Sequence, residues 1–171
     1  MGAPTDAQSM SKLFAPLKVG GMTLNQRIAM APMTRLRTDV SHLPLPSVKG
    51  YYQQRASVPG SHIVTEATVI SPRHGGYANV PGIHSNEQIA AWKEVTIAVH
   101  EKGTGHSLVS SSDVPMKSNL TNEMHRPNPL TELGIREVIL DFTAAAENAI
   151  LAGFDGVEIH DANGYLVDQF I

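Results

Sequence analysis

Short runs of apolar, β-forming residues alternate along the chain with longer segments of helical periodicity. The runs at residues 27–31 and 62–67 predict buried strands, and the first ends at Pro32, which cannot donate a hydrogen bond to a sheet. A third run, at residues 156–160, follows Gly153, a residue type that commonly ends a helix. The pattern therefore predicts three strands separated by helices and loops.

Three segments have the spacing of apolar residues that is typical of an amphipathic helix. The first spans residues 46–55 and begins with a proline, which the first helical turn tolerates. The second is predicted to run to Lys102 behind a capping box made by Ser85 and Gln88. The third begins after Thr131, a residue type suited to the N-cap. The expected inner faces are Val48, Tyr51 and Tyr52; Ile89, Trp92, Val95 and Val99; and Ile135, Val138, Ile139, Phe142, Ala146 and Ala149.

The order of these elements is strand, helix, strand, helix, helix, strand, which is a βα series of the α/β class with one strand missing. The gap falls at residues 103–130, where only the run 107–109 is strand-like. Loops longer than about 12–15 residues are uncommon in compact domains. Two successive helices also leave the first without a parallel strand to cross over to. We therefore expect that a segment normally forming a strand has been lost here or is disordered.

The composition is that of one globular domain. The chain has 171 residues, of which 42% are hydrophobic and 17% charged, enough for a substantial core. We expect residues 1–12 to be a flexible tail and residues 13–171 to form the domain. Gly20 and Gly21 lie among scattered apolar residues, which predicts a small turn-rich cap near the N-terminus.

Charge and residue types argue against several classes of function. The net charge is −3 and no basic run exceeds two residues, so neither nucleic acid nor an anionic membrane is expected as a partner. No apolar run approaches the ~20 residues of a membrane span. The first twelve residues also lack the apolar core of a signal peptide, so we expect a cytoplasmic protein. The chain has no cysteine and its histidines lack zinc-motif spacing, so no metal site is predicted.

Candidate chemistry is concentrated near the C-terminal end of the sequence. Residues 156–160 form the predicted third strand, and the pair Asn163 and Gly164 then turns the chain. His160, Asn163 and Tyr165 therefore crowd the carboxyl end of one strand, which is where α/β proteins with parallel strands bind ligands. By themselves the three side chains are a weak signal, because polar residues that only stabilise a turn give the same pattern.

Several stretches resemble the N-terminal half of the old yellow enzyme family, particularly its fungal members, including those of ergot-alkaloid pathways. The stretches are residues 13–37, 51–83, 87–95, 108–115 and 146–170, and the last reads AENAILAGFDGVEIHDANGYLVDQF. The resemblance implies a (β/α)8 TIM barrel that holds FMN. It also implies an enzyme of fungal secondary metabolism that uses NADPH to reduce carbon–carbon double bonds conjugated to a carbonyl.

The resemblance also implies roles for individual residues. Thr34 matches the threonine that hydrogen-bonds the flavin ring. His160 and Asn163 match the pair that grips the carbonyl oxygen of an unsaturated carbonyl substrate, and Tyr165 matches the tyrosine that protonates the carbon next to that carbonyl. The remaining matches are backbone contacts to the flavin, at Ala31, Pro32, Met33 and Ala67.

The chemistry of the family explains these residue types. Hydride delivered to the β-carbon leaves enolate charge on the carbonyl oxygen, and two neutral donors stabilise it like an oxyanion hole, at ~3 kcal/mol each. The neighbouring carbon then needs a proton from an acid that stays protonated at pH 7. A tyrosine phenol with a pKa of about 10 meets that condition.

Two departures from the family shape the expected fold. The family's third strand carries a Gln-Leu-Trp and a Gly-Arg that this chain lacks after Gly103. The chain also lacks strands five to eight and, with them, the usual phosphate site of such barrels. We therefore expect an incomplete (β/α)8 barrel made of strands 1, 2 and 4 with their helices, with open sheet edges that favour pairing with another chain.

Three functions remain open from the sequence. The first is a relative of the FMN-dependent ene-reductases whose reductase activity is impaired or lost. The second is a flavin-independent isomerase or cyclase on an unsaturated carbonyl compound, with Tyr165 as the acid and His160 and Asn163 polarising the carbonyl. The third is a non-catalytic protein that pairs its open sheet edges with a full-length homologue or with itself.

Overall fold

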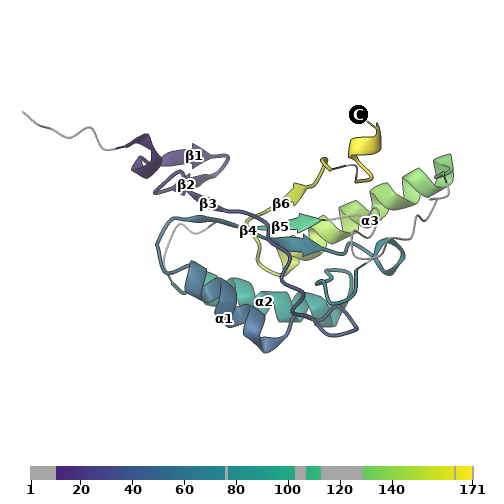
Figure 1. Ribbon diagram of the computed structural model, residues 1–171, viewed down its shortest axis with the longest axis horizontal. Coiled ribbons are helices and arrows are strands. Elements are labelled where there is room, and N and C mark those ends of the chain that lie inside the picture. The colour runs from purple at the N-terminus through teal and green to yellow at the C-terminus, as the bar shows by residue number, and fades with distance from the viewer. Residues whose placement is uncertain (1–10, 76, 103–106, 113–128, 164, 171) are drawn as a thin grey trace, which may run out of the picture.

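The central element is a parallel sheet in which the strands follow one another in chain order, β3-β4-β5-β6 (Figure 1). Their bounds are β3 (Ala29–Met30), β4 (His62–Thr68), β5 (Ser107–Ser112) and β6 (Gly156–Ile159). The computed structural model describes residues 11–75, 77–102, 107–112, 129–163 and 165–170. Within these residues the sheet stays open and forms no closed barrel.

The strand β5 corrects the prediction that the sheet consists of strands 1, 2 and 4. Residues 107–112 pair in parallel with β4 on one side and β6 on the other, so the position of the third strand is filled. The sequence signal was weak because four of these six residues are serine. A strand between two neighbours is held by backbone hydrogen bonds, which do not require apolar side chains. Residues 103–106 and 113–128 of the predicted gap lie outside the described residues.

The helices follow the strands as a βα series requires. They are α1 (Pro46–Arg55), α2 (Asn86–His100) and α3 (Glu132–Leu151). The predicted bounds of α1 are confirmed, and α2 has the predicted capping box, in which Ser85 and Gln88 bond each other's backbone. Thr131 caps α3 through a hydrogen bond of 3.1 Å from the N–H of Gly134.

The core lies between the sheet and the helices. Trp92 and Tyr52 are fully buried, and the indole Nε1 of Trp92 donates to the carbonyl of Gly82 at 3.1 Å. The predicted inner faces of α1 and α2 are confirmed, with Ile89 only half-buried. The prediction for α3 was wrong at Ile139, which is 58% exposed, because only a narrow stripe of this helix packs inward. The buried residues of α3 are Val138, Ala145 and Ala149.

The chain enters β6 along the side of α2. The hydroxyl of Thr96 donates to the carbonyl of Ala152 at 2.6 Å, directly after α3 ends. One turn further along α2, His100 Nε2 lies 3.0 Å from a carboxylate oxygen of Asp155. The rings of Trp92 and Phe154 meet edge to face with centroids 5.3 Å apart. These contacts fix the start of β6 and therefore the place where its carboxyl end emerges.

The N-terminal part forms the predicted turn-rich cap. It consists of a 3-10 turn, η1 (Lys12–Phe14), and an antiparallel hairpin, β1 (Leu17–Val19) with β2 (Met22–Leu24), whose turn uses Gly20 at φ +59°. The hairpin lies at the amino end of the strands (Figure 1), where Asn25 N–H bonds the carbonyl of Gly60 at 3.0 Å. Residues 1–10 of the predicted tail lie outside the described residues. The two other 3-10 turns are η2 (Pro72–His74) and η3 (Asp168–Phe170).

Candidate active site

The predicted site residues lie at the carboxyl edge of the sheet. Ala67 of β4 is in register with Ser111 of β5, which is in register with Glu158 of β6, two residues before His160. The loop at residues 31–34 directly follows β3. Because all four strands run parallel, their carboxyl ends share one edge, and the prediction that His160 lies at such an edge is confirmed.

His160, Asn163 and Tyr165 are brought into direct contact. The amide nitrogen of Asn163 lies 3.2 Å from His160 Nε2, and the rings of His160 and Tyr165 have centroids 5.1 Å apart at 59°. Asn163 adopts φ 61°, in the left-handed region that asparagine tolerates better than most residues. Gly164 of the predicted turn lies outside the described residues, and Tyr165 N–H closes the turn on the carbonyl of Ala162 at 3.2 Å.

The contact between Asn163 and His160 determines what the pair can offer a ligand. The Asn163 amide nitrogen can only donate, so the imidazole Nε2 accepts in this arrangement. In this arrangement the two residues cannot both donate to one carbonyl oxygen, because Nε2 carries no proton. For both to donate, the Asn163 amide would have to turn away from Nε2 and the imidazole would have to carry its proton there.

The loop at residues 31–34 presents neutral hydrogen-bonding groups to solvent. Its four residues are all exposed, and Met33 is 45% exposed. Exposed main chain and the hydroxyl of Thr34 are the kind of groups that fit the edge of a flavin ring, so these residues would hold the ring of FMN, with Ala67 beside them. Two strands separate β3 from β6, so roughly 14 Å separates this loop from His160.

Glu66 holds the loop at residues 31–34 in place from the neighbouring strand β4. Its side chain is 1% exposed, and its Oε2 accepts a hydrogen bond of 2.7 Å from the backbone N–H of Arg35. Its own N–H donates to the hydroxyl of Tyr52 at 2.9 Å. Burial raises the pKa of Glu66, opposed by the backbone N–H groups of Arg35 and Leu36. The only feature of the sequence that pointed to this loop-holding role was a single acidic residue within a predicted buried strand.

Tyr52 completes the support of β4 from α1. Burial raises the pKa of its phenol, and the charge of Glu66 raises it further, so the hydroxyl stays protonated throughout the physiological range. The residue is fully buried and packs against Trp92, with ring centroids 6.1 Å apart. Tyr52 is thus a positioning residue behind the strand that carries Ala67.

Two further features of the described residues bear on the kind of site. No three side chains among histidine, aspartate and glutamate come close enough to hold a metal ion in the part of the chain that the structure describes. None of the helices in these residues combines the length and the apolar character that crossing a membrane requires.

Known proteins match this chain both in sequence and in fold. The model of the NADH:flavin oxidoreductase / NADH oxidase family matches residues 12–109 and 104–171. The crystal structure of Old Yellow Enzyme from Pichia sp. AKU4542 superposes with a TM-score of 0.80 at 33% identity, covering 93% of this chain and 48% of that one.

Curated fungal relatives are closer in sequence. The chanoclavine-I aldehyde reductase fgaOx3 of Penicillium roqueforti is 52% identical over 94% of this chain and 48% of its own length. The "Probable inactive reductase easA" of Epichloe festucae var. lolii is 48% identical over 95% of this chain and 48% of its own. The chain spans about half the length of the curated relatives it matches.

The matches also contain an internal break. The alignment with fgaOx3 runs over 183 positions, more than the 171 residues of the chain, so that relative has residues without a counterpart here. The two family segments overlap at residues 104–109, of which residues 107–109 belong to β5. By the family match and the structural match together, the chain belongs to the NADH:flavin oxidoreductase / old yellow enzyme family, close to fungal ergot-alkaloid reductases.

Proposed function

We propose that the chain carries the carbonyl-binding and proton-donating part of an ene-reductase site, and that the 171-residue polypeptide alone reduces enals weakly or not at all. The observation that carries the first half is the contact of His160 with both Asn163 and Tyr165 at the carboxyl edge of the sheet. The substrate class is a carbonyl compound with a conjugated double bond.

His160 and Asn163 bind and orient the carbonyl. Once the Asn163 amide turns from Nε2, each residue donates one hydrogen bond to the same oxygen, which stabilises enolate charge there. Tyr165 holds the proton for the carbon beside the carbonyl, and its ring packs on His160, which restricts where its hydroxyl can point. FMN, when bound, would supply the hydride.

The open sheet supports the second half of the proposal. The loop at residues 31–34 and the apolar strand residues Val157 (43% exposed) and Ile159 (53% exposed) face solvent in the described part of the chain. A flavin ring held on such a surface stays in contact with water. Tight binding normally requires a site that buries most of the ligand surface, about 70–90% for small molecules.

The test is to purify the chain, titrate FMN by flavin fluorescence, and follow NADPH oxidation with a conjugated enal. The expected result is weak FMN binding and NADPH oxidation at or near the rate of free FMN. The reductase fgaOx3 serves as the positive control for the assay. Stoichiometric yellow FMN that bleaches with NADPH and reduces the enal would overturn the second half of the proposal.

A second candidate is a flavin-independent isomerase or cyclase. It is favoured by the fact that the contacts of His160 with Asn163 and with Tyr165 involve no residue of the 31–34 loop. In this role Tyr165 protonates a dienolate that the His160 and Asn163 donors stabilise. Flavin-free turnover of an unsaturated carbonyl compound that Tyr165→Phe abolishes would support it, and equal rates for the variant would end it.

A third candidate is a non-catalytic partner that pairs its sheet edges with itself or with a homologue. β3 and β6 are the outer strands of the described sheet, and an unpaired edge is a template for another chain. Light scattering on the purified chain, alone and mixed with fgaOx3, tests this candidate. A monomer under both conditions argues against it.

A further inference from the structure

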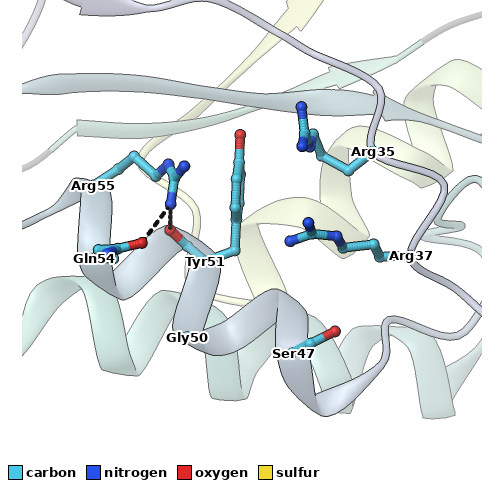
Figure 2. A pocket seen from close by; sticks show the side chains of 7 residues that line it. All are labelled: Arg35, Arg37, Ser47, Gly50, Tyr51, Gln54 and Arg55. Carbon is cyan, nitrogen blue, oxygen red and sulfur yellow. Dashed lines mark hydrogen bonds between the residues drawn. The ribbon is translucent and has the colours of Figure 1, made fainter.

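Three arginines gather around the ring of Tyr51. Arg35 and Arg37 come from the loop after β3, and their guanidinium carbons each lie 5.3 Å from the ring centroid. Arg55, in the last turn of α1, lies 3.7 Å from it. Figure 2 shows the ring standing between Arg55 on one side and the pair Arg35 and Arg37 on the other. Three positive charges thus share one small region of the surface.

A pocket of about 290 Å³ opens between these side chains. Its other lining residues are polar or small: Ser47, Gly50 and Gln54 of α1 (Figure 2). The volume is near the lower end of the usual range for ligand pockets, about 300–1,000 Å³. The pocket is therefore large enough for a small polar group and offers it mainly donors.

The first turn of α1 adds to the positive potential. Ser47 lies in that turn, which has no acidic residue, and the N-cap residue Leu45 provides no side-chain acceptor. The N-terminus of a helix carries the positive end of its dipole, and unpaired N–H groups there favour an anion. Ser47 also offers its hydroxyl as a donor.

The positive charge of the pocket is not matched by ion pairs. No carboxylate forms a salt bridge with Arg35, Arg37 or Arg55 in the described residues. Arg55 donates instead to two neutral oxygens, the Tyr51 carbonyl at 3.2 Å and Gln54 Oε1 at 2.8 Å. Glu66 is an acid that interacts electrostatically with Arg35 and Arg37. Its carboxylate is buried and already accepts a hydrogen bond from the backbone N–H of Arg35.

We propose that this pocket binds a phosphate group. Guanidinium groups match phosphate oxygens with paired N–H donors, and a doubly charged anion offsets more of the repulsion among three arginines than a carboxylate does. The Tyr51 ring is 7% exposed and covered by the arginines, so it holds them in place and offers no face for a base to stack on. The ligand is therefore either inorganic phosphate or the phosphate end of a larger molecule.

Isothermal titration of the whole chain, at fixed ionic strength in chloride, tests the proposal with inorganic phosphate and with adenosine 5′-monophosphate. We expect saturable one-to-one binding and a Kd at least ten-fold higher in Arg35→Gln and Arg37→Gln. Arg136→Gln, an exposed arginine of α3, is the matched control and should change the Kd less than two-fold. Equal Kd values for the two probes would identify free phosphate as the ligand, and a much lower Kd for the nucleotide would identify a phosphate ester.

Absent or non-saturable binding, or a control that loses as much affinity as Arg37→Gln, would overturn the proposal. Circular dichroism melting of each variant shows whether it folds. If an arginine variant fails to fold, Ser47→Ala provides the test, with an expected two- to five-fold rise in Kd, and an unchanged Kd counts against the site. The outcome is independent of the proposed carbonyl chemistry, because neither probe is a flavin or a carbonyl compound.

Discussion

The backbone N–H of Arg35 donates a 2.7 Å hydrogen bond to the buried carboxylate of Glu66. Arg35 directly follows the loop at residues 31–34, and Glu66 directly precedes Ala67. One side chain thus ties together the two segments expected to contact a flavin ring. Its charge also interacts with Arg35 and Arg37, which line the proposed phosphate pocket.

The free energy of unfolding should carry a pH dependence from Glu66. Burial raises its pKa above the ordinary value of 4.5, so from about pH 4.5 up to the raised value the folded chain holds a proton that the unfolded chain has released. The contribution of Glu66 to stability therefore falls as pH rises through this window, and it is flat below and above it. Urea unfolding of the wild type and Glu66→Gln from pH 4 to pH 8 should show this fall only in the wild type. Glu158→Gln, on strand β6, is the control and should keep it.

Tyr165→Phe should separate proton delivery from binding. The variant keeps the ring that packs 5.1 Å from His160 but has no proton to give, so any flavin-independent turnover of an unsaturated carbonyl compound should fall at least about 100-fold. The Kd for an unsaturated carbonyl ligand, measured by calorimetry, should change less than about two-fold. His160→Ala should raise that Kd instead. A Tyr165→Phe variant with wild-type turnover would remove Tyr165 from the chemistry.

Substitutions of Asn163 should separate its backbone role from its side-chain role. Its φ of 61° suits glycine, whereas alanine in the left-handed region costs about 1–2 kcal/mol. Asn163→Ala should therefore unfold at lower urea than Asn163→Gly. Both variants lose the amide donor and should weaken carbonyl binding to the same extent. Equal stability of the two variants would contradict the backbone assignment.

Thr96→Val should destabilise the junction between α2 and β6. The Thr96 hydroxyl donates to the Ala152 carbonyl at 2.6 Å in a buried place, so valine leaves that carbonyl without its donor, at a cost of about 1–3 kcal/mol. Thr143→Val is the matched control, because the hydroxyl of Thr143 bonds the Ile139 carbonyl at 2.9 Å on the exposed side of α3. Its cost should stay below about 0.5 kcal/mol. Urea unfolding measures both, and equal costs would contradict the prediction.

The fold was predictable where one segment carries its own signal. The capping box before α2 and the apolar spacing of α1 depend on residues within one or two turns, so the sequence contains the whole pattern. β5 contains only Leu108 and Val109 as apolar residues, and its pairing with β4 and β6 is a property of the sheet. Ile139 was misplaced because apolar spacing does not show how wide a stripe the neighbouring elements will cover.

The candidate sites show the same difference between features that lie within one segment and features that depend on tertiary packing. The resemblance identified His160, Asn163 and Tyr165 because they lie within six residues of each other. The cluster of Arg35, Arg37 and Arg55 could not be predicted from runs of basic residues. The three arginines are not consecutive in sequence, and only the packing of α1 against the loop after β3 brings their side chains to one pocket. Folding is thus needed to reveal groups whose members are distant in sequence.

The junction between α2 and β6 bears on how the length of this lineage can evolve. The bonds of Thr96 and His100 to the start of β6 involve no residue of the stretch 103–130. These two bonds would therefore survive insertions or deletions at residues 113–128, which lie outside β5, the strand that pairs with β6. Natural selection can change the length of the chain there without breaking the contacts that hold the start of β6, and fgaOx3 is a relative that has positions without a counterpart in this chain.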